Sequence, residues 1–578
     1  MGTHALHPGK SMGFWACGRK NRRVACLLLL AAAAAGVPDS RAEGLLPSLR
    51  SRAPPLEQAR PAGVPSDAEL EAAEATIGAI LIEPQEIFDA EEADDEARAF
   101  RAANRLHART RPETIASQLL FHTGDRYSAD RLAETERLLR KDRYLYEASV
   151  VPVAYRDGEV DVLVRTRDVW TLNPGVSFGR SGGVNSSSVE IEEMNLLGTG
   201  RQLSLGYSVD HDRSATALRY RDPHLGDSWW RLAAGYADSS DGGSWQLDIE
   251  RPFHALTATR AGGLSLLDDE RVDQHYDRGD AVDEYRARRR LATVYGGRSA
   301  GLSEGWSRRW TAGVTADESR FEPTADTVDP AQVPGDRSLV YPWLGFEILE
   351  NRYEKRSNRD QIGRIEDVAL GWHAGLQLGW ADSGLGSDRD ALMFRGDAAR
   401  GFDFGPEDSL QLGATLGGRL EDGALAGTVL GASARMHHHA SRTRGLYVSL
   451  QTDAGYNLDA DAPLELGGDS GLRGYPLRYT AGEGRWLFTA EERWFTDWYP
   501  LRLVHVGAAA FFDAGGTWGE NPGGSPPIGL LRDVGLGLRL GMSRSALANV
   551  LHVDLAMPLD GGSDISNLQV LVSTKASF

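Results

Sequence analysis

Segments that alternate between apolar and polar or small residues recur along this chain. They include Gln202–Val209, Gly371–Trp380, Val534–Gly541, Leu551–Met557 and Leu568–Phe578. In each segment one face carries mainly Leu, Val, Tyr, Trp or Met, and the other carries mainly Gly, Ser, Gln or charged residues. Successive side chains of a strand point to opposite faces, so this period of two predicts strands with one apolar and one polar face.

The character of the two faces favours a membrane β-barrel over a soluble β-sandwich, which alternates as well. In a membrane barrel the apolar side chains meet lipid and the small or polar ones line the lumen. Gly371–Trp380 has a tryptophan near each end of its apolar face, as expected for anchoring at two membrane interfaces. Phe578, the last residue, lies on the apolar face of its segment. We therefore predict a mostly β fold, with a transmembrane antiparallel β-barrel over residues 169–578.

The length of this region suggests the number of strands. From Trp170 to Phe578, sixteen strands of about 10 residues leave roughly 15 residues for each connection, although fourteen or eighteen strands would also fit. The polar stretch Asp268–Asp283 is predicted to be one of the longer outer loops, because its Asp and Gly residues favour turns. The expectation is a barrel of about sixteen strands.

The N-terminal third predicts a smaller, separate domain. Residues 43–75 are rich in Pro, Ala and Arg without a sustained period and predict a flexible linker. Residues 76–168 predict a small α+β domain with the order strand, helix, helix, strand, strand. The expected elements are Thr76–Ile82, a helix from Pro112, a helix capped by Ser128, Leu145–Tyr155 and Glu159–Arg167.

Composition and charge predict that the chain is exported and limit the class of partner it binds. Residues 1–42 predict a secretory signal peptide, with basic residues before the apolar run Val24–Ala35 and a small-x-small site at Ser40–Ala42. Cys17 and Cys26 both fall in this segment, so the exported chain would not depend on disulfides. Beyond it the chain has 57 basic and 81 acidic side chains, a net charge of −24. This acidity argues against nucleic acid as a partner.

A charged turn and two charged strands form the candidate site. Gly471–Tyr475 contains an Arg-Gly-Tyr turn, the segment Trp486–Trp494 contains Glu491, and Phe511–Gly515 reads Phe-Phe-Asp-Ala-Gly. The charged Asp513 is expected to face the lumen, since exposure to lipid would be costly. This combination resembles the BamA/TamA-like outer-membrane superfamily, in which the Arg-Gly-aromatic loop folds back into the barrel.

The resemblance implies a lock in the lumen. Its residues would be Arg473, Gly474, Tyr475, Glu491, Asp513 and Gly515. Arg473 is expected to pair with Asp513 and with Glu491 rather than Glu492, because a guanidinium group binds carboxylates in a bidentate fashion. The alternative is a solvated loop, with Asp513 as an ordinary lumen carboxylate. Phe578 would be the C-terminal signal that delivers the barrel for folding.

Residues 76–168 resemble the POTRA (polypeptide-transport-associated) domain of the same superfamily. A single such domain departs from BamA-like and TamA-like members, which carry several, and from two-partner-secretion exporters, which carry two. The resemblance implies a bacterial outer-membrane protein with this domain in the periplasm, where it would bind extended or unfolded polypeptide clients at a sheet edge. The alternative is an α+β spacer without clients.

The implied activity is insertion or translocation of polypeptides at the outer membrane. The other implied partners are outer-membrane lipid and lipopolysaccharide, and periplasmic chaperones or accessory proteins at the POTRA domain. A two-partner-secretion exporter and a passive pore are the alternatives. His437–His439 is expected at a solvated rim rather than around a metal, because adjacent strand residues point to opposite faces. The sequence has no nucleophile elbow, zinc motif or phosphate loop, so we expect no enzyme, cofactor or metal.

Overall fold

The computed structural model describes residues 60–88, 104–105, 107–362, 364–405, 407–500, 503–521, 527–542, 544–546, 550–562 and 564–575. The predicted signal peptide 1–42, most of the predicted linker and Phe578 lie outside these residues. The described part belongs to one compact unit, Arg52–Phe578.

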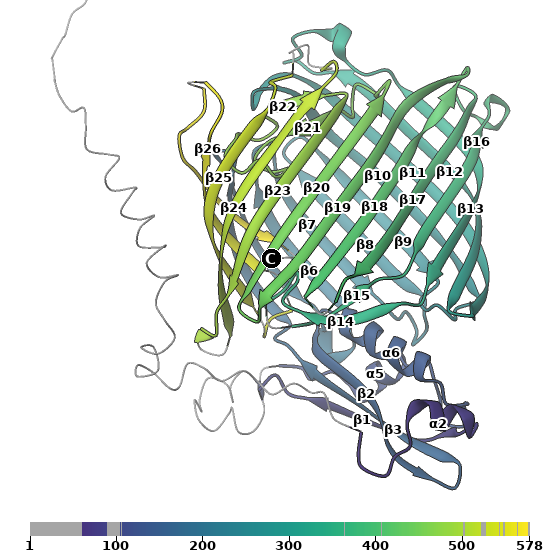
Figure 1. Ribbon diagram of the computed structural model, residues 1–578. Coiled ribbons are helices and arrows are strands. Elements are labelled where there is room, and N and C mark those ends of the chain that lie inside the picture. Colours follow the sequence, from purple (N-terminus) through teal and green to yellow (C-terminus); the bar gives the residue numbers. More distant parts are fainter. Residues whose placement is uncertain are drawn as a thin grey trace, which may run out of the picture. The chain divides into compact units, whose positions relative to one another are not determined.

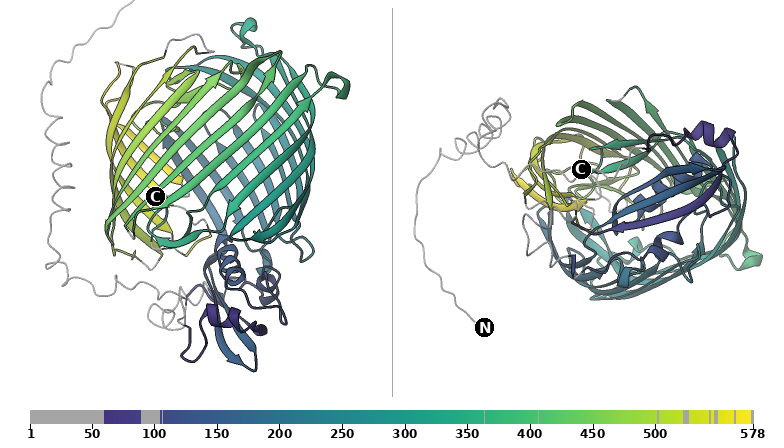
Figure 2. Two further views of the ribbon diagram at one scale, coloured as in Figure 1. Left: turned by 45° about the vertical axis from the view of Figure 1, so that its right-hand side comes forward. Right: turned by 90° about the horizontal axis from the view of Figure 1, so that it is seen from below.

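Twenty antiparallel strands form a closed barrel in the described part of the chain (Figure 1). Each barrel strand pairs with the next barrel strand along the chain, and β27 closes the barrel on β4. The wall is seen from the side and from one end in Figure 2. The strands are β4 (Leu172–Ser181), β5 (Val184–Glu193), β6 (Gln202–Val209), β7 (Ser214–Asp222), β8 (Arg231–Ser239), β9 (Gly242–Arg251), β10 (Arg260–Asp277), β11 (Asp280–Ser303), β12 (Trp306–Pro323), β13 (Arg337–Glu350), β16 (His373–Ala381), β17 (Ala391–Asp403), β18 (Asp408–Glu421), β19 (Ala424–Ser441), β20 (Arg444–Tyr456), β23 (Gly484–Phe495), β24 (Val504–Trp518), β25 (Leu531–Met542), β26 (Val550–Pro558) and β27 (Gln569–Lys575).

The prediction of about sixteen strands is therefore wrong. The estimate assumed long connections, but several turns are short. Asp268–Asp283, predicted to be an outer loop, continues β10 and β11, and only Arg278 and Gly279 lie between these strands. Charged cross-strand pairs stabilise this extension: Arg288 donates two hydrogen bonds to Asp268, at 3.0 and 2.9 Å. The polar composition that suggested a loop therefore belongs to two strands that pair with each other.

The outward faces of the barrel are apolar, as the alternation predicted. In β6 the side chains of Leu205 and Tyr207 are exposed, and in β16 those of Leu378 and Trp380 are exposed as well. Large exposed apolar surfaces of this kind indicate a lipid environment rather than water. Helices give a separate result, because none in the described residues is both long and apolar enough to span a bilayer.

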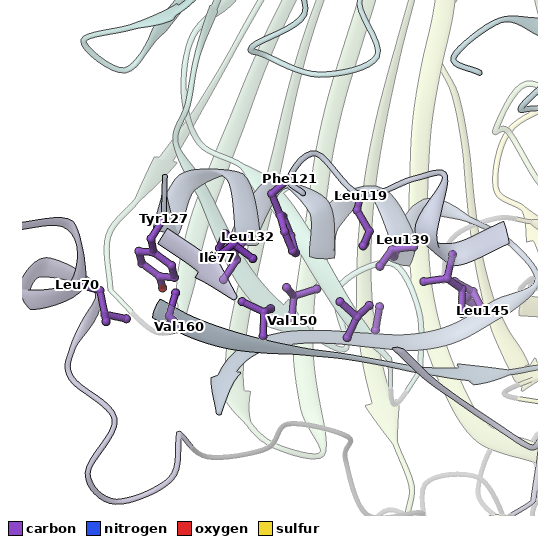
Figure 3. Close-up of a cluster of buried hydrophobic side chains, with 14 of the residues drawn as sticks. Leu70, Ile77, Leu119, Phe121, Tyr127, Leu132, Leu139, Leu145, Val150 and Val160 are labelled. Carbon is purple, nitrogen blue, oxygen red and sulfur yellow. The ribbon is translucent and has the colours of Figure 1, made fainter. Parts of the chain in front are cut away.

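The N-terminal domain, residues 66–168, is a three-stranded sheet covered by helices. Its elements are α2 (Asp67–Ala72), β1 (Thr76–Gln85), α5 (Pro112–Ala116), α6 (Ala129–Lys141), β2 (Leu145–Arg156) and β3 (Glu159–Asp168). The sheet order is β1-β3-β2, with β1 parallel to β3 and β2 antiparallel to it. Figure 3 shows Phe121, Leu132 and Leu139 directed from the helical layer toward Val150 and Val160 of the sheet.

The end of the predicted linker is helical instead. Ser66 and Glu69 form a capping box at the start of α2, in which each side chain bonds the other's backbone N–H. Leu70 in this helix is buried in the core of the N-terminal domain. These local and packing contacts explain why residues 66–75 belong to the domain, although they were included in the predicted linker 43–75.

Two short hairpins mark the two ends of the barrel. We call the end where β4 follows the N-terminal domain the near end, and the opposite end the far end. Because successive strands are antiparallel, the connection 351–372 lies at the near end and contains β14 (Tyr353–Ser357) and β15 (Ile365–Ala369). The connection 457–483 lies at the far end and contains β21 (Leu464–Leu466) and β22 (Thr480–Gly482). Figure 1 shows the two hairpins at opposite ends. Within the described residues, three 3-10 turns complete the elements: η3 (Leu196–Gly198), η4 (Pro330–Gln332) and η5 (Ser383–Leu385).

Candidate functional site in the barrel lumen

The far-end connection 457–483 folds inward and has a small apolar core of its own. Leu466, Leu472 and Tyr475 are buried and pack together with Leu531 of β25. Gly471 has a φ of 121°, and a Cβ there would lie 2.3 Å from Leu487 Cδ2. Only glycine accommodates both this backbone conformation and this close approach. This close packing holds the tip of the loop so that Arg473 points toward β23 and β24.

Arg473 binds two carboxylates on neighbouring strands. Its Nε and Nη2 donate to Asp513 Oδ2 and Oδ1 of β24, at 2.7 and 3.1 Å. Its Nη1 donates to Glu491 Oε2 of β23 at 2.9 Å. The Arg473 and Asp513 side chains are 7 % and 0 % exposed, so water does little to screen this pair. The guanidinium carbon also lies 3.3 Å from the centre of the Phe511 ring, as in a cation–π contact.

Strand register explains which acids are available. Thr489 of β23 stands opposite Asp513 of β24, and its hydroxyl donates to Asp513 Oδ1 at 2.8 Å. Glu491 lies two residues further on the same face, so it also reaches Arg473. Glu492 belongs to the other face and accepts a hydrogen bond from Arg444 instead. The structure thus brings together Arg473, Asp513 and Glu491, and leaves Glu492 out.

The charged cluster is larger than the sequence suggested. Arg493 Nε donates to Glu491 Oε1 at 3.0 Å, and Arg539 Nη2 donates to Glu491 Oε2 at 3.2 Å. Arg539 also pairs with Asp554 of β26, which lies 3.6 Å from Arg473 Nη1. The signal that singled out Asp513, a charge between apolar strand residues, is present at Arg539 and Asp554 too. What the sequence lacked was the register that brings these strands together.

The other predicted residues position the loop. The Gly474 N–H donates to Asp533 Oδ2 at 3.1 Å, and a Cβ on Gly474 would lie only 2.7 Å from Asp533 Cβ. The buried Tyr475 donates its hydroxyl to the carbonyl of Arg532 at 2.7 Å. A Cβ on Gly515 would lie 2.9 Å from Leu466 Cδ2, so this glycine leaves room for the loop core. Phe578 falls outside the described residues.

The three adjacent histidines do not converge. His437 Nδ1 accepts from Arg359 at 3.1 Å, His438 Nδ1 lies 2.8 Å from Asp408, and His439 Nε2 lies 3.0 Å from the carbonyl of Asn358. His437 is buried, unlike the solvated rim residue that was expected. Among the described residues, no group of His, Cys, Asp and Glu side chains is arranged to hold a metal ion.

The arrangement is that of a fixed ionic lock rather than a reaction centre. Its members are Arg473, Arg493, Arg539, Glu491, Asp513, Asp533 and Asp554. Opposite charges offset one another inside the wall, and removing one partner leaves a buried charge that costs roughly 3–5 kcal/mol. This cluster holds the far-end loop against the inner face of the barrel wall.

Comparison with known proteins places the barrel in a family. The Omp85 superfamily domain matches residues 195–569, which include all of the lock. The solved structure of CdiB from Acinetobacter baumannii is 13 % identical to this chain; the match covers 88 % of this chain and 74 % of that chain, with a TM-score of 0.43. The structure of CdiB from Escherichia coli is 12 % identical; the match covers 87 % of this chain and 77 % of that chain, with a TM-score of 0.45. BamA from Haemophilus ducreyi lacking POTRA domains 1–3 has 14 % identity, 86 % and 84 % coverage and a TM-score of 0.36. No curated protein matches the chain. Because the matched domain covers most of the barrel, the chain belongs to the Omp85 superfamily of outer-membrane β-barrels.

Proposed function

We propose that this protein assists the insertion or translocation of polypeptides at the outer membrane. The observation that carries the proposal is the far-end loop held in the lumen by Arg473, Asp513 and Glu491. A loop fixed by buried ion pairs suits a barrel whose lumen opens under control, and a passive pore would gain nothing from it.

The N-terminal domain is proposed to be a POTRA domain that receives clients in the periplasm. In the described sheet β1 is an edge strand, with β3 on one side. Leu81 in the middle of β1 is 48 % exposed, so this edge strand presents an apolar side chain. An extended client adds to such an edge through main-chain hydrogen bonds, which demand little of its sequence.

The seam between β27 and β4 is the proposed working surface. Most barrel strands pair over long registers, for example β10 with β11 from Arg260–Arg298 to Asp277–Asp280. In the described residues, β27 pairs with β4 only through Val572 and Arg180. A seam with few hydrogen bonds opens at a lower cost than the rest of the wall, because fewer backbone groups lose their partners.

Reconstitution tests the proposal. The full exported chain is placed in liposomes of outer-membrane lipids, and a urea-unfolded β-barrel client is added with a periplasmic chaperone. We expect the client to fold faster than in empty liposomes, as measured by its heat-modifiable mobility. A client that instead crosses into the liposome without inserting would support the alternative function, a two-partner-secretion exporter. Steady conductance with no effect on any client would contradict the proposal and support a passive pore.

A further inference from the structure

The near-end hairpin formed by β14 and β15 is a feature that the sequence did not suggest. Other near-end turns are short, such as Glu304–Gly305 between β11 and β12. The connection 351–372 is much longer, and the residues between β14 and β15 reach side chains inside the barrel. We call residues 358–362 of this segment the hairpin tip.

The hairpin tip is bound to the lumen wall by polar contacts. Arg359 Nη2 donates to His437 Nδ1 of β19 at 3.1 Å. The Arg359 carbonyl accepts from Arg493 Nη1 of β23 at 2.8 Å, and the Asn358 carbonyl lies 3.0 Å from His439 Nε2. Arg359 is 3 % exposed. Contacts with two separate strands fix the tip across the inner face of the wall.

An apolar contact adds to this attachment. Ile362 is 6 % exposed and packs with Phe495 of β23, Ala509 of β24 and Val550 of β26. A Cβ on Gly541 of β25 would lie 3.2 Å from Ile362 Cβ, so the absence of a side chain at Gly541 makes room for the tip. The four strands between β23 and β26 are those that carry the lock, so the hairpin tip occupies the near-end part of the same lumen.

The base of the hairpin is bound to the N-terminal domain. Arg140 of α6 donates from Nε and Nη2 to Asp367 of β15, at 2.8 and 2.6 Å, and both side chains are largely buried. Lys355 of β14 lies 2.6 Å from Glu136 of α6. Arg364 donates to the carbonyl of Leu145 at 2.9 Å. A bidentate pair that is shielded from water is among the stronger polar contacts available to proteins.

These contacts form a continuous path from α6 to the lock. Arg140 binds the hairpin through Asp367, and the hairpin tip binds Arg493 through the carbonyl of Arg359. Arg493 in turn donates to Glu491, which accepts from Arg473. We propose that the β14–β15 hairpin is a second plug, which closes the near end of the lumen and couples the position of the N-terminal domain to the Arg473 lock.

Two physical consequences follow. With both plugs in place, releasing the far-end loop alone opens the lumen only while the hairpin tip has also left the wall. A displacement of α6 pulls on Asp367, withdraws the Arg359 carbonyl from Arg493 and so loosens the contacts of Glu491. The idea that a client bound at the N-terminal domain drives this displacement rests on the proposed function. The presence of a plug at the near end does not depend on that function.

A disulfide tests the plug directly. Cysteines at Ile362 and Gly541 are close to the Cβ separation that a disulfide requires, about 3.8 Å. The double variant Ile362→Cys with Gly541→Cys is made in a chain that carries Arg473→Ala, with Cys17→Ser and Cys26→Ser. Single-channel conductance is recorded after reduction and after oxidation. We expect frequent openings in the reduced protein and their loss on oxidation, with recovery on renewed reduction.

The controls separate the plug from misfolding. Ile362→Cys alone, in the same Arg473→Ala chain, should show the same openings under both conditions. Heat-modifiable mobility verifies that each barrel is folded. A second variant, Ile362→Asp, places a charge among Phe495 and Ala509 and should increase openings without any cysteine. Equal openings in the reduced and oxidised double variant would overturn the plug. No client is present, so this outcome is independent of the insertion assay.

The coupling has its own test. Asp367→Asn removes the charge that Arg140 binds, and trypsin added from the far end of reconstituted barrels reports on release of the far-end loop. We expect faster cleavage after Arg473 or Arg478 than in the unaltered protein. The matched control is Glu83→Gln, which removes the exposed pair with Arg165 within the N-terminal domain. Unchanged cleavage in Asp367→Asn would show that the hairpin does not communicate with the lock.

Discussion

At the scale of single residues, the lock shows how a barrel wall tolerates charge. Arg473 faces two acids, and Arg493 and Arg539 surround Glu491 from the other sides. Glu491 therefore accepts from three arginines, and Asp513 accepts from two N–H groups of Arg473 and from the Thr489 hydroxyl. This explains why the charges can be buried. It also explains why removing one partner of the lock is expected to cost more stability than removing one partner of an exposed ion pair.

Adjacent glutamates on opposite faces of β23 offer a matched pair of substitutions. Glu491→Gln leaves Arg473, Arg493 and Arg539 without their shared anion, and we expect it to lower the free energy of unfolding by roughly 3–5 kcal/mol. Glu492→Gln removes only the pair with Arg444, which is more exposed, and we expect it to lower the free energy of unfolding by less than about 1 kcal/mol. Urea unfolding in lipid vesicles measures both. Similar losses in the two variants would contradict the lock.

A steric prediction concerns Gly474. Gly474→Ala places a methyl group 2.7 Å from Asp533 Cβ and 3.0 Å from the backbone nitrogen of Pro558, so the loop tip must move away. Overpacking of this kind costs about 1–3 kcal/mol. We expect faster cleavage of the loop by trypsin. Gly296→Ala in β11 is the control, since nothing lies within 4 Å of its added Cβ, and its cleavage should match that of the unaltered protein.

The sequence predicted the centre of this site better than its surroundings. Arg473 and Asp513 were recognisable because the Arg-Gly-Tyr turn and the Phe-Phe-Asp-Ala-Gly segment together resemble the superfamily's motifs, and because Asp513 is a charge in an otherwise apolar strand. Asp533 was not singled out, although it lies directly opposite Asp513 and accepts from Gly474. Its role depends on the register between β24 and β25, and the alternation of a single strand carries no information about register.

At the scale of elements, the β14–β15 hairpin was missed for a physical reason. Its strands are five residues each and mostly charged or mixed, so they lack a clear apolar face. Their stability comes from ion pairs with α6 and from buried side chains such as Ile362 and Val368, whose burial no local pattern reveals. The helix after Ser128 was predictable, because the Ser128 hydroxyl caps it by accepting from the Arg131 N–H.

Glu366 makes docking of the hairpin dependent on pH. Its carboxylate accepts the backbone N–H groups of Arg359, Asp360 and Gln361, at 3.0, 3.0 and 3.2 Å. Burial, together with the charge of Asp360, raises the pKa of Glu366 from 4.5 to about 7, against the opposing effect of these hydrogen bonds. The docked hairpin therefore holds a proton that the released one gives up, so docking weakens as pH rises from about 4.5 through about 7.

Amide hydrogen exchange over 353–369 measures this dependence, after correction for intrinsic rates. We expect stronger protection at about pH 5.5 than at about pH 8. Glu366→Gln carries no titrating proton, so its protection should be the same at both values. Protection of the unaltered hairpin that increases with pH would mean that the hydrogen bonds outweigh burial, and that Glu366 stays ionised.

At the scale of the whole molecule, the sequence predicted a barrel but not its size. Each alternating segment shows which side chains face lipid, and Gln202–Val209 coincides with β6. The number of strands depends on how length is shared between strands and turns. Asp268–Asp283, at the far ends of β10 and β11, resembled a loop, because these ends pair largely through charged residues rather than through apolar ones. Composition alone could not separate these possibilities.

The closure of the barrel leads to the last prediction. Arg180 of β4 stands opposite Asn185 of β5 on one side and Val572 of β27 on the other. Cysteines at Arg180 and Val572 therefore link the seam, whereas cysteines at Arg180 and Asn185 link a hairpin that stays closed in any mechanism. Directly opposite strand residues have Cβ atoms about 4.5–5.5 Å apart, within reach of a short bifunctional thiol reagent.

If clients enter the membrane through the seam, cross-linking Arg180→Cys to Val572→Cys abolishes catalysed folding of a β-barrel client, and cleaving a reducible linker restores it. The Arg180→Cys and Asn185→Cys pair shares one substitution and one strand, so any loss of activity there would reflect damage rather than closure. Full activity with a locked seam would instead direct the client through the lumen. Both plugs would then have to leave, and the disulfide between Ile362→Cys and Gly541→Cys should block the same assay. The two cross-links therefore distinguish a lateral from an axial route in one protein.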